Sequence, residues 1–261
     1  MKGSTVFVCK QDTLYENQYG FRPKHSTIDA VAKFTPHVMT SIENIHTTMA
    51  VFLGLSKAFD TIDHQIILIK LDHYGVRGIA LDWVRNYLCN RSQFVSFGGA
   101  QSRCHDVTCV VPQCSVLGPL LFIIYTNDLL NSFSYSQCIL FADDTTIYHA
   151  NQNNLCTDIE NYLNVLVQWF YANKLSLNIQ KTKLIVFHPK RSARNGDVRI
   201  SMKLGAQHIT SVRSVKLLGI YIYIYIYIYI YIYRERERER ETETETETET
   251  MEWSGRNISI M

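Results

Sequence analysis

The chain has 261 residues, 46% of them hydrophobic and 19% charged, which is enough for one or two domains with a buried core. Its 26 basic and 24 acidic residues are distributed unevenly, since 21 basic and 15 acidic residues precede residue 220. The length excludes a mini-protein, and the lack of a long apolar run excludes an obvious membrane span. The positive surplus before residue 220 is compatible with a polyanionic partner such as nucleic acid.

The seven cysteines are an odd number, and no signal peptide precedes them. This usage predicts reduced thiols in an intracellular protein of the nucleus or cytoplasm. The densest group is Cys104, His105, Cys109 and Cys114, whose spacing does not match a zinc finger or a zinc ribbon. We therefore expect no structural metal in this group.

Hydrophobic periodicity predicts alternating strands and helices in the first half of the chain. Residues 49–55 form a short apolar run that is typical of a buried strand, and Asp60 or Thr61 could cap the helix that follows. The predicted elements are, in order, a strand at 49–55, helices at 62–71 and 81–88, and strands at 94–97 and 107–111.

Hairpins predominate in the second half of the chain. Ser115 can cap a helix through the apolar run that follows it. Residues 138–148 are two β-prone runs that meet at a pair of aspartates, a pattern that predicts a hairpin. A long amphipathic helix at 155–173 and strands at 184–187 and 215–220 complete the pattern. The predicted fold class is α+β, with an antiparallel sheet backed by helices.

From residue 220 onward the chain consists almost entirely of two-residue repeats. Ile and Tyr alternate up to residue 233, Arg and Glu up to 241, and Thr and Glu up to 250. The Ile/Tyr run is apolar on both faces and lacks Pro and Gly, which is typical of an aggregation-prone strand. The charged runs have nothing to bury, so we expect residues 220–261 to lie outside the fold.

The pair Asp143 and Asp144 is the sharpest candidate for chemistry. Burying an unpaired carboxylate is costly, and a bound cation is the usual remedy. Hard oxygen ligands at the tip of a hairpin suit Mg²⁺, which keeps several waters and accepts phosphate oxygens from a substrate. A solvent-exposed Asp-Asp turn is the common alternative, and the dipeptide alone favours it.

Six segments in order give this pair a context. They read NQYGFRPKHSTIDAV, VFLGLSKAFDTIDH, VPQCSVLGPLLFIIYTNDL, LFADDTTIY, YANKLSLNIQKTKLIVF and VKLLGIYI. In this order and spacing they resemble the reverse transcriptases of non-LTR retrotransposons, of the LINE and jockey-like kind. The resemblance covers about residues 14 to 220.

The resemblance implies a right-hand polymerase palm with partial fingers and without a thumb. The implied divisions are a residual fingers segment at 1–50, palm at 51–65, fingers and palm helices at 66–108, palm through primer grip at 109–219, and the repeat tail at 220–261. The implied activity is RNA-directed DNA polymerisation, a nucleotidyl transfer, with an RNA template, a DNA primer and dNTPs as partners. No membrane partner is expected.

The resemblance also implies roles for charged residues. Asp143 and Asp144 would hold Mg²⁺, which clamps the nucleoside triphosphate and activates the primer 3′-oxygen. Lys181 would lie near the leaving pyrophosphate as an acid or charge stabiliser, although a solvated loop lysine is the alternative. Arg22 could contact nucleotide phosphates or the template backbone through its guanidinium.

Uncharged residues receive implied roles as well. Phe59 would stack under the incoming sugar and exclude a 2′-hydroxyl, and it could equally be a core aromatic. Gln113 and Ser115 would lie where template and nucleotide meet. The implied primer grip consists of Leu217, Leu218 and Gly219.

The chain departs from the family pattern at catalytically important positions. Gly54 stands where the family has an acid, the third metal ligand of the palm. Asp60 cannot replace it, since six residues further along a helix displace it by roughly 9 Å. Val110 and Cys114 replace two glycines of the loop that the family reads as G-V-P-Q-G-S, and a Cβ there would crowd the base pair.

These departures predict that this copy is inactive. Two alternatives to a polymerase domain stay open at this point. One is a catalytically silent remnant that still binds nucleic acid, and the other is a translated retroelement fragment without a function.

Overall fold

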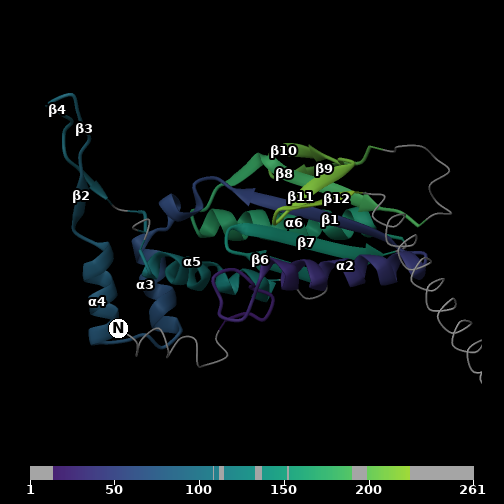
Figure 1. Cartoon of the computed structure of the whole chain (residues 1–261), viewed down its shortest axis with the longest axis horizontal. Helices are drawn as coiled ribbons and strands as arrows, with labels where there is room; N and C mark the ends of the chain where they lie inside the picture. The colour runs from purple at the N-terminus through teal and green to yellow at the C-terminus, as the bar shows by residue number, and fades with distance from the viewer. Residues whose placement is uncertain are drawn as a thin grey trace, which may run out of the picture.

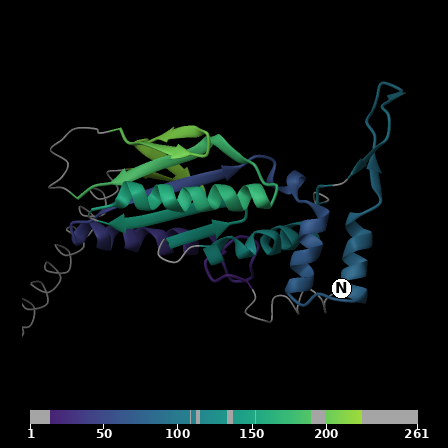
Figure 2. The same cartoon turned by 180° about the vertical axis from the view of Figure 1, so that it is seen from behind.

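The computed structural model describes residues 14–107, 109–111, 115–132, 137–151, 153–189 and 199–223. At its centre lies a four-stranded antiparallel sheet, shown in Figures 1 and 2. The strand order is β6 (Gln137–Phe141), β7 (Asp144–Asn151), β1 (Thr47–Leu55) and β8 (Leu177–Phe187). The antiparallel sheet and the hairpin at the aspartate pair confirm the predicted fold class.

Strand β1 is the buried centre of the sheet. Val51 pairs with Ile147 on one side and with Leu184 on the other. Eight of the nine residues of β1 are buried, because both faces of the sheet are covered. This confirms the prediction of a buried strand at residues 49–55.

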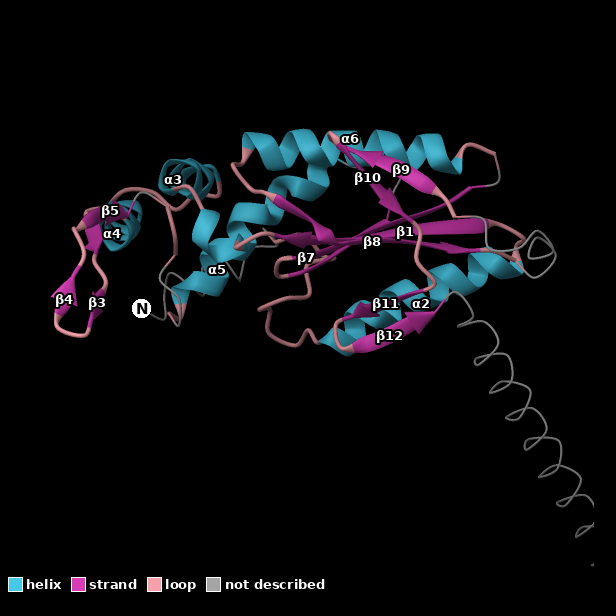
Figure 3. Cartoon of the chain, turned by 90° about the horizontal axis from the view of Figure 1, so that it is seen from above, coloured by secondary structure: helices cyan, strands magenta, loops and turns pink. Residues whose placement is uncertain are grey.

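A helix covers each face of the sheet, as Figure 3 shows from above. Helix α6 (Leu155–Ala172) was predicted from its periodicity, whereas no element was predicted for α2 (Thr27–Glu43). Ser26 and Asp29 cap α2 reciprocally. On that face Phe34 makes edge contacts with the rings of Phe52, Tyr148 and Phe187.

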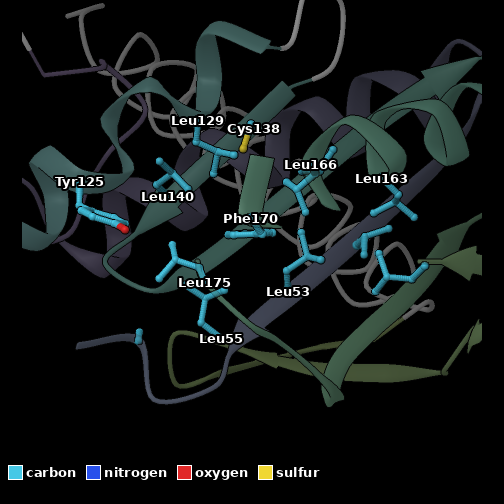
Figure 4. Close-up of a cluster of buried hydrophobic side chains, with 14 of the residues drawn as sticks. Leu53, Leu55, Tyr125, Leu129, Cys138, Leu140, Leu163, Leu166, Phe170 and Leu175 are labelled. Carbon is cyan, nitrogen blue, oxygen red and sulfur yellow. The ribbon is translucent and has the colours of Figure 1, made fainter. Parts of the chain in front are cut away.

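The larger core lies between the sheet and α6. Figure 4 shows Leu53 of β1 beside Leu166 and Phe170 of α6, and Leu55 of β1 beside Leu175. Helix α5 (Leu117–Thr126), followed by the short helix η2 (Asn127–Ser132), adds the buried Tyr125 to this core. The Tyr125 hydroxyl donates a hydrogen bond of 2.7 Å to a backbone carbonyl, and burial raises the pKa of Tyr125 to about 12.

Two helices and a narrow arm lie at one end of the molecule (Figure 1). The short helix η1 (Ala58–Thr61) precedes α3 (His64–His73), whose cap is Asp63 and not Asp60 or Thr61. The Asp63 carboxylate accepts hydrogen bonds from the N–H groups of Gln65 and Ile66 at the start of the helix. After α4 (Ile79–Leu88) the arm is built from β2 (Arg91–Gln93), β3 (Ser96–Phe97), β4 (Ala100–Gln101) and β5 (His105–Val107).

Two small hairpins end the described chain. They are β9 (Ser201–Leu204) with β10 (Gln207–Thr210), and β11 (Ser214–Leu217) with β12 (Ile220–Tyr223). Ile222 is only 1% exposed and joins the core on the α2 side of the sheet. The expectation that the fold ends before residue 220 was therefore wrong by four residues, because the start of the Ile/Tyr repeat pairs with strand β11.

The rest of the repeat tail lies outside the described residues. Within the described ranges, no helix combines the length and the apolar character needed to cross a bilayer.

Candidate active site

The aspartate pair lies at the turn of the β6–β7 hairpin. Phe141 pairs with Asp144, which leaves Ala142 and Asp143 as the two loop residues. Ala142 has a φ of 56°, a left-handed conformation that two-residue hairpin loops require but that costs a residue with a Cβ. Asp143 is half-buried and Asp144 is exposed. The tight turn therefore places both carboxylates at one end of the sheet.

Strand β1 brings Gly54 to this hairpin. The last ladder pair between β1 and β7 joins Leu53 to Thr145, and the next residues on the two strands are Gly54 and Asp144. Side chains alternate between the two faces of a sheet, so Gly54 shares a face with Phe52, and Asp144 shares a face with Thr146. Phe52 and Thr146 pair with each other, so all four residues lie on the same face. Gly54 thus lies beside Asp144, as the resemblance implies for the third acid.

An irregularity in β8 brings Lys181 to the same place. The register between β1 and β8 shifts between Phe52 and Gly54, and Gly54 pairs with Asn178. The Asn178 side chain accepts the Lys181 N–H at 3.1 Å, which holds the irregular segment. A Cβ added at Gly54 would lie 2.8 Å from the Cβ of Lys181. The Lys181 side chain therefore packs directly against Gly54.

The charges at this end of the sheet act on one another. The pKa of Asp144 is raised above its ordinary value, chiefly because the surrounding chain displaces part of the water around its carboxyl although the residue as a whole is exposed, and also because Asp143 is negative. Lys181 opposes this rise through its positive charge. The fold has thus brought together Asp143, Asp144 and Lys181, three of the residues for which the resemblance implies a role.

The residues present do not fit a palm site with three carboxylates. Asp143 and Asp144 supply hard oxygen ligands, but in the part of the chain that the structure describes no three His, Cys, Asp or Glu side chains gather as a metal site. Gly54 has no side chain and so offers no side-chain ligand atom, and the Lys181 side chain lies next to the position that a Cβ at residue 54 would take. The arrangement therefore lacks the third carboxylate that the family resemblance places here.

Phe59 and Ser115 have structural partners. The Phe59 ring is half-buried and lies 4.6 Å from the ring of Phe122 and 6.3 Å from that of Phe21, centre to centre. The Ser115 hydroxyl accepts the N–H of Gly118 at 2.9 Å, at the start of α5. The core interpretation thus has direct support for Phe59, and Gln113 lies outside the described residues.

Arg22 and the expected primer grip also have observed positions. Nη1 of Arg22 donates to the carbonyl oxygens of Tyr15 and Gln18, at 2.8 and 3.2 Å, and so braces the loop that contains it. Leu217 is buried at the end of β11. Leu218 and Gly219 form the β11–β12 turn, with φ of 48° and 91°.

Val110 holds a strained backbone at one of the two positions where the resemblance places a glycine. Its φ is 99°, which a β-branched residue rarely adopts. The Val110 N–H donates to the carbonyl of Ile62 at 3.2 Å, and Nε2 of His64 lies 2.9 Å from the carbonyl oxygen of Val110. The loop therefore keeps the conformation that suits glycine although the glycine is gone.

Val110→Gly is expected to raise the free energy of unfolding by about 1 kcal/mol, since strain of this kind costs of order 1–3 kcal/mol and added backbone entropy offsets part of its release. Urea unfolding measures the change. The matched control is Val95→Gly in the exposed arm, where φ is not positive and glycine is expected to be neutral or destabilising. A loss of stability in Val110→Gly as large as in Val95→Gly contradicts the strain.

Gln18 and Gly20 lie against the aspartate turn, and the sequence predicted a role for neither of them. Gln18 is 1% exposed, and its side-chain oxygen accepts the N–H of Ala142 in the aspartate turn. A Cβ on Gly20 would lie 2.2 Å from the Ala142 nitrogen. The only sequence signal was the segment NQYGFR, whose match to the family gave neither residue a role.

Comparison with known proteins agrees with this geometry. The family model for reverse transcriptase (RNA-dependent DNA polymerase) matches residues 6–222. The chain is 29% identical over 184 residues to the probable RNA-directed DNA polymerase from transposon BS of Drosophila melanogaster, covering 65% of this chain and 20% of that protein. It is 25% identical over 226 residues to the polymerase from mobile element jockey of the same species, covering 82% of this chain and 24% of that protein.

Solved structures resemble the fold. Telomerase from Candida albicans, in complex with a fragment of telomeric RNA, superimposes with a TM-score of 0.54 at 11% identity, over 79% of this chain and 35% of that one. Truncated apo telomerase from Candida tropicalis gives 0.52 at 9% identity, over 84% of this chain and 44% of that one. The chain spans about a fifth to a quarter of the two curated relatives. It belongs to the reverse transcriptase family, as the reverse transcriptase domain of a jockey-like non-LTR retrotransposon.

Proposed function

We propose that this chain is an RNA-directed DNA polymerase domain that binds template and primer but has lost detectable extension. The observation that carries the proposal is Gly54, which lies beside Asp144 at the end of β1 and has Lys181 packed against it. The hairpin acids are retained, whereas the position for a third acid offers no ligand. The template would be RNA, and the primer and nucleotides would be DNA and dNTPs.

Each remaining charged group of the site has a proposed part. Reverse transcriptases as a family use divalent metal ions, and Mg²⁺ is the expected ion. Asp143 and Asp144 could hold one ion weakly, and Lys181 would stabilise negative charge on phosphate oxygens close to them. Phe59 would contact the sugar from the edge of the core, and Leu217, Leu218 and Gly219 would lie along the primer.

The experiment is binding of a labelled RNA–DNA template–primer, followed by fluorescence anisotropy. We expect saturable binding with a Kd of about 10⁻⁶ M or tighter in about 50 mM salt, weakening linearly with the logarithm of salt concentration as phosphate contacts require. Gly54→Asn should bind within about threefold of the natural chain. Absence of saturable binding in a chain that unfolds cooperatively contradicts the proposal.

The same preparation discriminates the alternative of a fragment without function. A chain with the buried sheet described above should unfold in urea in one cooperative transition. A chain that shows neither a transition nor binding supports the fragment interpretation.

A further inference from the structure

The segment around Gln18 forms an extra edge on the central sheet. The Tyr19 N–H donates to the carbonyl of Leu140 at 2.8 Å, and the Leu140 N–H donates to the carbonyl of Asn17 at 2.9 Å. Gln18 thereby makes an isolated parallel bridge with Leu140 of β6. The segment covers the outer edge of β6 just before the aspartate turn.

The Gln18 side chain reaches from this edge into the turn. Its Oε1 accepts the N–H of Gly20 at 2.8 Å and the N–H of Ala142 at 3.2 Å. Because both partners are N–H donors, the oxygen must face them, and the orientation of the amide is fixed. Its Nε2 is buried and has no hydrogen-bond partner among the described atoms. The observed hydrogen bonds of this buried amide are therefore made by its oxygen.

Ala142 needs such a partner. It is 7% exposed and has a left-handed φ, so its N–H is buried at a strained position immediately before Asp143. A buried N–H without an acceptor costs about 1–3 kcal/mol, which would favour a rearranged turn. A small shift in this turn would move both carboxylates.

The loop that presents Gln18 is itself held at several points. The Gln18 N–H donates to the carbonyl of Tyr15 at 3.1 Å, and Nη1 of Arg22 donates to the Gln18 carbonyl at 3.2 Å. The Tyr15 N–H donates to the side chain of Asn127 at 2.8 Å. These contacts fix Gln18 relative to both the hairpin and the end of α5.

We propose that Gln18 is a positioning residue, whose side-chain oxygen fixes Ala142 and thereby the carboxylates of Asp143 and Asp144. The effect on the hairpin stands on the contacts above. The effect on nucleotide transfer rests on the function proposed in the preceding subsection. Gln18 is not proposed to contact nucleotide or primer, and it acts only through the β6–β7 turn.

The first test is amide hydrogen exchange followed by NMR. Gln18→Met keeps the side-chain length but removes the acceptor, so the Ala142 amide should exchange at least tenfold faster relative to the amides of β1. Gln18→Glu keeps an acceptor oxygen and, at a pH low enough to keep the buried carboxyl uncharged, should stay within about threefold of the natural chain. Ser41→Ala, which removes a buried hydroxyl bonded within α2, is the matched control and should leave Ala142 unchanged.

Two outcomes overturn the structural part of the proposal. One is an Ala142 exchange rate in Gln18→Met within twofold of the natural chain. The other is equal loss of protection in Gln18→Met and Gln18→Glu, which would indicate general loosening. If Gln18→Met does not fold, Gln18→Asn serves instead, because its amide is one methylene too short to reach Ala142.

The second test uses primer extension by Gly54→Asp as background. Adding Gln18→Met should lower the rate at saturating dNTP by about tenfold to a hundredfold, since small misplacements of reacting groups have effects of this size, and should leave the nucleotide KM within twofold. An unchanged rate overturns the catalytic part. If Gly54→Asp alone shows no extension, the placement of Gly54 at the lost catalytic position fails, and hydrogen exchange still decides the role of Gln18.

Discussion

Extension of a DNA primer on an RNA template is expected to be undetectable with the natural sequence and to appear in Gly54→Asp. The reason is electrostatic, because the natural site has two acids at the hairpin and none at the end of β1. Removing a single preorganised electrostatic contact from an enzyme costs about 10²- to 10³-fold in rate, and loss of a carboxylate that would hold a metal ion should cost at least as much. Single-turnover extension with Mg²⁺ measures the difference.

The structure adds a condition to this repair. The new Cβ would lie 2.8 Å from the Cβ of Lys181, so the irregular segment of β8 held by Asn178 must shift. Overpacking of this kind typically costs about 1–3 kcal/mol of stability. Gly54→Asp is therefore expected to be less stable than the natural chain and more active. Cys114→Gly and removal of the repeat tail are natural additions to the repaired chain.

Gly54→Asn is the matched control for this prediction. It brings the same volume and the same contact with Lys181, but no negative charge. It should lose as much stability as Gly54→Asp and gain no extension. Equal rates in the natural chain and in Gly54→Asp contradict the placement of Gly54 at the catalytic site.

Gly20→Ala is expected to have the largest effect on stability. The added Cβ would lie 2.2 Å from the nitrogen of Ala142 and 2.9 Å from the carbonyl carbon of Phe141. Both atoms belong to backbone, which cannot move aside as a flexible side chain can, so a loss of about 3 kcal/mol is expected. Urea unfolding measures the loss, and faster exchange of the Ala142 amide locates it.

Gly75→Ala separates this contact from the general cost of replacing glycine. Gly75 has a φ of 85° and open space where its Cβ would lie, so only backbone strain of about 1 kcal/mol is expected there. A loss in Gly20→Ala no larger than in Gly75→Ala contradicts the close approach of the loop to the hairpin.

Local patterns were sufficient to predict the centre of the fold. The apolar run of β1, the two runs of the aspartate hairpin and the period of α6 each carry their own signal, and the structure pairs β1 with the hairpin strand β7. The proximity of Lys181 to the acids follows from the family resemblance, and no local pattern predicts it. The Asp63 cap was missed because Asp60, Thr61 and Asp63 are all capping residues, and only the helix start distinguishes them.

Long-range contacts could not be predicted in the same way. Gln18 lies 124 residues from Ala142 in sequence, and a buried glutamine looks like any loop glutamine before the chain is folded. The contact of Lys181 with Gly54 arises from a register shift, which the pattern of β8 does not reveal. The short strand β12 forms because β11 supplies an edge for it, although its repeat sequence resembles no natural core.

The most direct test of the central claim is a titration with Mn²⁺, a paramagnetic substitute for Mg²⁺, followed by NMR of backbone amides. In Gly54→Asp, we expect selective broadening at residues 142–145 and 53–55 with an affinity at least about tenfold above that of the natural chain and of Gly54→Asn, as an added carboxylate ligand requires. Equal affinity in all three chains, or broadening away from the hairpin, would contradict the assignment of Gly54 to the lost metal ligand.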